Sequence, residues 1–527
     1  MSLYHTEKQN QFITLENTDY NKKRIFRNTI FLYLRQLLVM VISLFTVRIV
    51  LNTLGVIDYG IYNVVGGAVT MFSFFVGAMA SSSQRYYSFM LGKKDEKGLH
   101  NVFNTTFLIY ILITFLVLIL AETIGLWFVY NKLNIPNERF DIALIVFQLT
   151  IISSLCNILT TPYVSSIIAH EQMGIYAKIS ILEAILKLVT VYILTLLNID
   201  KLLLYGILQL ISSFLISSFY IKFCQKKFPE CHIVLIKRYD IKTLKEIAYF
   251  SIWSLLGNIA SIVKNQGASF LLNIFYGPIL NTAQTIANQI RTYSSIFFQN
   301  FSTAVKPQII KLYASHEYDK MFSLIFQSCK FTYFLMLIVI LPLIYNINYI
   351  LYLWLGNIPE YVTIFSKILL LEALIDSISS PMSAANMATG KIRNYQIIIC
   401  LITLLNLPIS YILLTLNYKV ESVFFVSAFL QIIITITRTL FLIKIQKKSF
   451  TKSLTIVYIP CLLVTILSIP ICYILVRNET TNIINLFINV PLQVLIIAII
   501  IFILGLNNNE RIIILNLIKR KMIWKKS

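Results

Sequence analysis

The sequence contains few charged residues. Of its 527 residues, 13% are Asp, Glu, Lys or Arg, compared with about 25% in a typical soluble domain. It also has no polar stretch long enough to enclose a hydrophobic core of its own. These two shortages exclude a soluble globular domain as the main part of the chain.

The sequence also lacks the usual signatures of covalent and nucleotide chemistry. Its seven cysteines form no disulfide framework, and Cys224 and Cys231, which share one loop, have no second pair of residues to complete a metal site. No Gly-rich phosphate loop is present, so ATP-driven pumping by this chain is not expected, and we expect no cofactor. A cleavable signal is not expected either, because the polar first 27 residues lead into a full-length apolar run.

Long apolar runs make up most of the chain. Hydrophobic residues account for 57% of it, and the mean hydropathy is +0.76. Runs of about 20 apolar residues predict membrane-spanning helices, because a barrel would show alternating segments of about ten. We therefore predict an all-α polytopic membrane protein with about fourteen spans, at 28–53, 59–84, 104–129, 142–167, 174–197, 201–222, 247–276, 279–304, 323–345, 362–388, 394–416, 420–443, 453–476 and 483–506.

The formal net charge of +22 is concentrated in alternate loops. Lysine and arginine precede the first span, fill the loops after spans 2, 6 and 12, and end the chain, whereas other loops such as LNTLGVIDYG have none. Positive loops stay in the cytoplasm, which predicts that both termini are cytoplasmic and that the number of spans is even. A basic membrane face explains the high pI without a nucleic-acid partner.

The sequence also contains an internal repeat. With a shift of 219, about ten of 33 positions in 162–194 are identical, and Pro162 aligns with Pro381. With a shift of 221, Leu51 aligns with Leu272 and Thr70 with Arg291. An even number of spans per copy predicts two parallel six-helix repeats that form two lobes. The predicted segments are a cytoplasmic N-terminal segment (1–27), an N-lobe (28–222), an inter-lobe loop (223–246), a C-lobe (247–443), spans 13 and 14 (444–506) and a basic cytoplasmic tail (507–527).

Two such lobes are typical of transporters that bind cargo between them and alternate access. Pro162 and Pro381 occupy equivalent places late in spans 4 and 10, and a proline tends to kink a helix. They are candidate hinges, although fixed bends that shape the lobes are an equal alternative.

Residues 50–97 carry a recognisable set of motifs. These are the turn Leu54-Gly55-x-x-Asp58-Tyr59-Gly60-x-Tyr62, the Ser83-Gln84-Arg85 close of span 2, and a Gly-Lys-Lys loop. In these features the chain resembles bacterial polysaccharide flippases of the multidrug/oligosaccharidyl-lipid/polysaccharide exporter superfamily. The resemblance implies flipping of undecaprenyl-pyrophosphate-linked O-antigen or capsule units across the bacterial inner membrane. It also implies partners in membrane lipid and other polysaccharide assembly proteins.

Two cations lie deepest in the predicted spans. They are Lys264, beside Asn265 and Gln266, and Arg291, on a polar stripe that includes Gln284 and Asn288. A charge near the bilayer centre costs roughly 2.5 kcal/mol or more and persists where it meets water, a partner or a ligand. We predict a cavity face on which these cations bind the cargo's phosphates and the amides bind sugar hydroxyls. Span 2 has a matching stripe (Asn63, Gly67, Thr70, Gly77, Ser81), for which close helix packing is an equal alternative.

The other intramembrane charges have competing explanations. Arg35 and Arg48 in span 1 are further substrate-binding candidates or residues that snorkel to the nearer interface. Glu183 and Lys187, four apart in span 5, are expected to pair with each other. Glu372 and Asp376, four apart in span 10, are candidates for coupling transport to an ion gradient; alternatively they neutralise Lys264 or Arg291 across the lobes.

Two other classes of membrane protein fit the sequence less well. A membrane polymerase or ligase would present a large extracytoplasmic catalytic loop, whereas the outside loops here have about a dozen residues at most, so an enzyme is not expected. A multidrug or cation exporter of the same fold is the nearest rival, and it would need an apolar, acidic cavity. The deep cations favour an anionic cargo.

Overall fold

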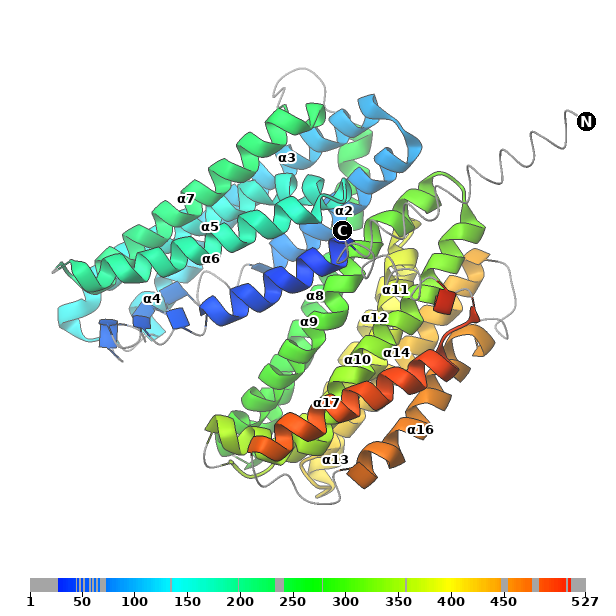
Figure 1. Ribbon diagram of the computed structural model, residues 1–527. Helices are drawn as coiled ribbons and strands as arrows, with labels where there is room; N and C mark the ends of the chain where they lie inside the picture. Colours follow the sequence, from blue (N-terminus) through cyan, green and yellow to red (C-terminus); the bar gives the residue numbers. More distant parts are fainter. Residues whose placement is uncertain are drawn as a thin grey trace, which may run out of the picture. The chain divides into compact units, whose positions relative to one another are not determined.

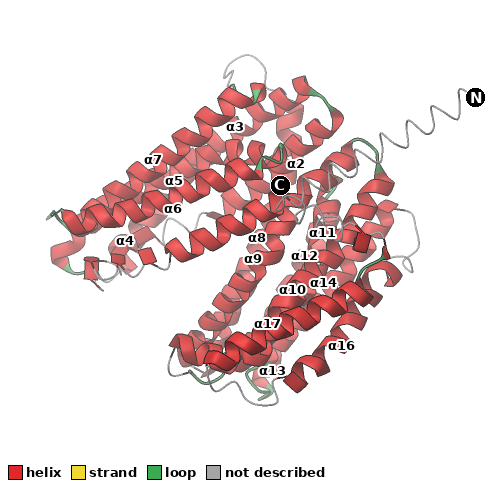
Figure 2. Ribbon diagram, in the orientation of Figure 1, coloured by secondary structure: helices red, strands yellow, loops and turns green. Residues whose placement is uncertain are grey.

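The computed structural model describes most of the predicted spans. The described residues are 27–43, 45–46, 49–50, 53–55, 58, 61–62, 65–66, 73–132, 135–197, 199–232, 241–276, 278–355, 358–446, 454–475, 483–508 and 510–512. Their regular structure is helical throughout, and Figure 2 shows no strand among them. The predicted all-α class is therefore confirmed.

The chain divides into two compact units, both shown in Figure 1. Unit 1 comprises residues 1–259, 303–316 and 391–393. Its described helices are 27–43, α2 (Ser73–Lys93), α3 (Glu96–Leu120), the π-helix η1 (Ala121–Gly125), α4 (Leu126–Lys132), η2 (Asn137–Arg139), α5 (Phe140–Ala169), α6 (Met173–Leu196), α7 (Lys201–Lys227) and η3 (Pro229–Cys231). In this unit α5 packs along α7 and against α2.

Unit 2 comprises residues 260–302, 317–390 and 394–527. Its helices include α10 (Tyr318–Leu355), α11 (Val362–Ala388), α12 (Arg393–Leu404), α13 (Asn406–Thr415), α14 (Ser422–Gln446), η4 (Leu454–Tyr458), α16 (Ile459–Leu475), α17 (Ile483–Ile500) and η5 (Ile501–Gly505). Helix α11 packs between α10 and α14. Two long helices, α8 (Ile241–Tyr276) and α9 (Pro278–Ala314), contribute residues to both units. The predicted segment boundaries stay predictions.

Ten helices in the described part of the chain are long and apolar enough to cross a membrane. They do not include α9 and α11, the helices that carry Arg291 and Glu372. Many large apolar side chains on the ten are exposed, such as Phe115, Phe214 and Ile466. That surface is what a helix presents to lipid, and the composition thus agrees with a multi-pass membrane protein.

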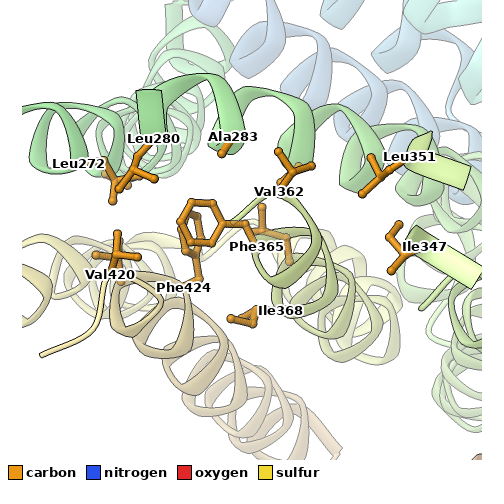
Figure 3. Close-up of a cluster of buried hydrophobic side chains, with 14 of the residues drawn as sticks. Leu272, Leu280, Ala283, Ile347, Leu351, Val362, Phe365, Ile368, Val420 and Phe424 are labelled. Carbon is orange, nitrogen blue, oxygen red and sulfur yellow. The ribbon is translucent and has the colours of Figure 1, made fainter. Parts of the chain in front are cut away.

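The apolar core of unit 2 joins six helices: α8, α9, α10, α11, α13 and α14. Figure 3 shows Leu272 of α8, Leu280 of α9 and Leu351 of α10 around the ring pair of Phe365 (α11) and Phe424 (α14). The two ring centroids are 4.3 Å apart. Lipid tails are as apolar as these side chains, so this cluster stabilises the unit by close packing rather than by escape from water.

Helix α17 and the residues after it are attached to α10 by buried polar pairs, and α16 is attached by the hydrogen bond between the Tyr333 and Thr465 hydroxyls, which are 2.7 Å apart. Lys330 Nζ lies 2.6 Å from Glu510 Oε2 and donates to the carbonyl of Gly505, while Asn346 Nδ2 donates to Gln493 Oε1 over 3.1 Å. Such pairs fix helix contacts in lipid because a polar group without a partner is costly there. The two helices beyond the predicted repeat are therefore integral to unit 2.

The two predicted proline positions lie in continuous helices. Pro162 is buried in α5 and Pro381 is buried in α11, and both helices end seven residues later, at Ala169 and Ala388. These ends are related by the shift of 219 that aligns the sequences. The hinge role stays a prediction.

Candidate polar cleft and charge cluster

Neighbouring stretches of α8 and α9 in unit 2 form an open cleft of about 360 Å³. Its lining consists of neutral polar side chains and one tyrosine: Asn265, Gln266, Ser269, Gln284, Thr285, Asn288, Gln289, Thr292 and Tyr293. The four predicted amide residues, Asn265, Gln266, Gln284 and Asn288, are all among them. Asn265 and Gln266 come from α8, whereas Gln284 and Asn288 are four residues apart on α9 and therefore share one helical face, as the sequence predicted.

Gln284 has a special place in this lining. Its side chain is buried, with 4% of the residue exposed, and its Oε1 has no hydrogen-bond partner among the described residues. A buried acceptor without a donor costs about 1–3 kcal/mol. The cleft therefore contains a buried acceptor for the donor of a ligand or of water.

The predicted cations lie beside the cleft and converge on one carboxylate. Lys264 Nζ lies 2.8 Å and Arg291 Nη2 3.1 Å from the same oxygen, Glu372 Oε1. Ser427 of α14 donates to the other oxygen, Oε2, over 2.7 Å. Only 1% of the Glu372 side chain is exposed, compared with 15% for Lys264 and 25% for Arg291. Two cations and one carboxylate leave one net positive charge on this cluster.

The second carboxylate of α11 has partners of its own. Asp376 Oδ1 accepts from Arg438 Nη1 and from Gln431 Nε2, both over 2.8 Å. Arg438 also donates to Ser379 Oγ over 2.7 Å. Glu372 pairs with Lys264 and Arg291, as the neutralisation alternative expected, whereas Asp376 pairs with Arg438 instead. The coupling role of the two acids stays a prediction. All these residues belong to unit 2, so the expectation that the pairing would cross between lobes is wrong.

The remaining candidates lie elsewhere. Arg35 belongs to unit 1, where its guanidinium stacks over the Tyr176 ring at 4.8 Å. Arg48 lies outside the described residues, as do Asn63, Gly67 and Thr70. Glu183 and Lys187 pair as predicted, with Nζ 2.7 Å from Oε1.

Sequence reasoning missed two groups of site residues. Thr285, Gln289 and Thr292 form a second polar stripe beside the first, and their own spacing of four and three was a usable signal. Ser427, Gln431 and Arg438 come from a helix far away in the sequence. Their pairing depends on how α11 packs against α14, and no local pattern reports it.

The cysteine loop is a buried structural cluster at the end of unit 1. His170 stacks on Phe228, and its Nε2 lies 2.6 Å from Glu230 Oε1. Burial alone would raise the pKa of Glu230, but the hydrogen bond and charge of His170 outweigh it and lower that pKa. Cys224 and Cys231 are both buried, and the described residues contain no group of three ligands for a metal ion.

The fold is that of a known class of membrane transporters. Solved structures that match it over most of the chain are MATE family transporters of the MOP superfamily. No family model and no curated protein sequence matches the chain. These neighbours belong to the superfamily that the resemblance of residues 50–97 points to. That this chain belongs to it, and to its polysaccharide branch, stays a prediction.

Three of the solved structures illustrate the match. An outward-facing multidrug resistance MATE transporter has a TM-score of 0.70 at 14% identity, covering 81% of this chain and 97% of its own. A MATE in the straight conformation has a TM-score of 0.71 at 14% identity with the same coverage. The Vibrio cholerae MATE transporter VcmN has a TM-score of 0.65 at 16% identity, covering 82% and 98%. At these identities the likeness establishes the fold.

Proposed function

We propose that this protein is a membrane transporter that moves a polar, lipid-linked oligosaccharide across the bilayer by alternating access, as the resemblance of residues 50–97 implies. The observation that carries the proposal is the cleft between α8 and α9, whose nine lining residues are polar and uncharged. Amides and hydroxyls suit the hydroxyl groups of a glycan, because each can donate and accept. An apolar or acidic lining would not suit a glycan in this way.

The charge cluster beside the cleft supports an anionic head group. Lys264 and Arg291 keep one net positive charge after Glu372 is counted, and both are partly exposed. An arginine beside a lysine is well suited to phosphate oxygens. Cargo phosphate and Glu372 would then compete for the same two cations.

A second candidate is multidrug export, which the comparisons favour over oligosaccharide flipping. The solved structures compared above are named multidrug resistance or MATE transporters. Export of cationic drugs would call for carboxylates in the binding cleft, and the described lining here has none.

One experiment separates the two candidates. The gene is expressed in a flippase-null strain that carries a defined glycan locus, and in a drug-sensitive strain that lacks its own exporters. We expect surface glycan to return in the first strain and drug resistance to stay unchanged in the second. Resistance without surface glycan would establish the second candidate. If neither surface glycan nor resistance is observed, both candidates are contradicted.

Cleft variants test the site itself. Asn288→Leu combined with Gln289→Leu removes two amides from the lining. Surface glycan should then fall at least tenfold while the amount of protein in the membrane is unchanged. The matched control is Asn348→Leu with Gln327→Leu, two amides outside the lining, which should leave export at the parental level.

The orientation and energy source are part of the same proposal. We propose an inner-membrane protein with cytoplasmic termini, driven by a proton or sodium gradient in which Glu372 or Asp376 is the coupling group. Reporter fusions at Lys242 and Pro359 should lie on opposite sides of the membrane. Fusions that report the same side would contradict the topology.

A further inference from the structure

A second group of cations lies in unit 1, and the charge cluster of α11 does not involve it. Lys306, near the C-terminal end of α9, places Nζ 3.2 Å from the hydroxyl oxygen of Ser81 on α2. Among the described residues no carboxylate forms an ion pair with Lys306. The other lysine of this stretch, Lys311, is engaged differently, because its Nζ lies 2.6 Å from Glu171 Oε1.

A further cation lies one helical turn from Ser81. Arg85 follows Ser81 by four residues, so the two share a face of α2. It is 6% exposed, and its guanidinium stacks on the rings of Tyr86 at 4.4 Å and Phe250 at 5.3 Å. The rings hold the guanidinium in place, and the exposed Glu246 is close enough for its charge to act on Arg85.

Glu171, a buried acid that contacts the same stretch of α9, already has two partners. Glu171 Oε2 accepts a hydrogen bond from Gln308 Nε2 over 2.7 Å, and Oε1 accepts one from Lys311 Nζ over 2.6 Å, so both carboxylate oxygens have a partner. Helix packing brings the two cationic segments close: a Cβ added at Gly92 of α2 would lie 2.7 Å from the Lys311 backbone. Here α2 and α9 therefore enclose a hydroxyl and an ammonium that is not neutralised.

We propose that Lys306 and Ser81, with the charge of Arg85 behind them, form a site in unit 1 for a phosphate-type oxyanion. The ammonium and the hydroxyl are both donors and lie close enough together to bind two oxygens of one phosphate. Lys306 is partly exposed, so a ligand has access to it. A phospholipid head group and free pyrophosphate both present phosphate oxygens. The proposed site therefore does not depend on the identity of the cargo.

The test measures the thermal midpoint of the purified full-length protein in a neutral detergent. The probes are sodium pyrophosphate and dihexanoyl phosphatidic acid, each compared with sodium chloride at matched ionic strength. We expect one or both to raise the midpoint of the parent by about 2–4 °C. A rise with pyrophosphate alone identifies a soluble or cargo phosphate, and a rise with the lipid alone identifies a head group.

Three variants make the result specific. Lys306→Met should lose the shift and keep or raise the midpoint without ligand, because it removes a cation that lacks a counter-ion. Lys306→Arg should keep the shift. The control is Lys320→Met, whose parent lysine is exposed and already pairs with Glu317 at 2.5 Å, and it should also keep the shift. An equal shift in Lys306→Met, or no shift in the parent with either probe, overturns the proposal.

Discussion

The two units are built from similar helices but place their charges differently. In unit 1 the buried and half-buried ion pairs lie at helix ends: Arg139 pairs with Asp58 and Asp200, Glu171 with Lys311, and His170 with Glu230. In unit 2, Glu372, Asp376 and Lys330 pair in the middle of helices. Ion pairs at helix ends hold loops in place. Charges in the middle of a membrane helix are costly and persist where they have a partner.

The sequence repeat sharpens this contrast. The shifts of 219 and 221 place small neutral residues opposite the charged residues of unit 2: Ser153 opposite Glu372, Asn157 opposite Asp376, Ser43 opposite Lys264 and Thr70 opposite Arg291. In unit 1, Ser153 pairs with Ser213 of α7 over 2.5 Å. At these positions the aligned residues of the first copy are neutral, whereas those of the second copy form the ion pairs described for unit 2.

The largest effect is expected from Glu372→Ala. It leaves Lys264 and Arg291 without their shared carboxylate, and breaking a buried pair costs about 3–5 kcal/mol. The thermal midpoint and the yield from membranes should both fall sharply. Adding Lys264→Met should recover part of the loss, since one of the two unpaired cations is then gone.

Glu372→Gln distinguishes neutralisation from ion coupling. If Glu372 couples transport, the Gln variant folds and binds cargo, but its transport in reconstituted vesicles no longer responds to the gradient. A folded variant with parental gradient dependence would remove the coupling role.

Asp376→Asn should cost less, about 1.5–3 kcal/mol, because it removes one charged hydrogen-bond partner from Arg438. Asp376 is also more exposed than Glu372, at 29% of its side chain, so water can replace part of the interaction. The check is the thermal midpoint of Asp376→Asn beside that of Glu372→Gln. A larger loss for Asp376→Asn would contradict this ranking of the two acids.

A smaller effect is expected at the end of unit 1. Because the folded-state pKa of Glu230 is lowered, its contribution is complete above the ordinary value of 4.5 and is lost as pH falls from there through the folded pKa. The parent should therefore lose of order 1 kcal/mol more stability than Glu230→Gln between pH 6 and pH 3.5. Thermal midpoints across this range test it, and parallel pH profiles would contradict it.

The smallest effect is expected from Ser153→Ala, which removes the neutral counterpart of Glu372. Loss of one hydroxyl pair costs about 1 kcal/mol. The thermal midpoint should drop slightly and transport should stay at the parental level. A loss as large as that of Glu372→Ala would mean that the two copies use this position alike.

Hydropathy predicted the helices well and their ends less well. The span predicted at 279–304 is part of α9, which continues to Ala314. The extension carries Lys306, Gln308 and Lys311, and hydropathy reads such residues as loop although Glu171 binds two of them. The span predicted at 394–416 is broken at Leu405. The sequence shows the cause of this break in Pro408, which has no backbone N–H to donate to the carbonyl four residues earlier.

The site was predictable in its composition and only partly in its contacts. Spacing along one helix placed Gln284 and Asn288 together, and depth identified Lys264 and Arg291. Their sharing of one oxygen of Glu372 needed the packing of three separate helices. A short-range pattern contains no information about such a contact.

The length of α9 limits how it can lie in a bilayer. Its 37 residues make a rod about 55 Å long, and a hydrocarbon core is about 30 Å thick. Even tilted by about 40°, the rod projects about 42 Å along the bilayer normal, so about 12 Å of it must extend beyond the hydrocarbon. Lys306 lies about 42 Å along the helix from Pro278. A helix that enters the bilayer at Pro278 therefore places the Lys306 ammonium at the depth of the phosphates of the opposite leaflet.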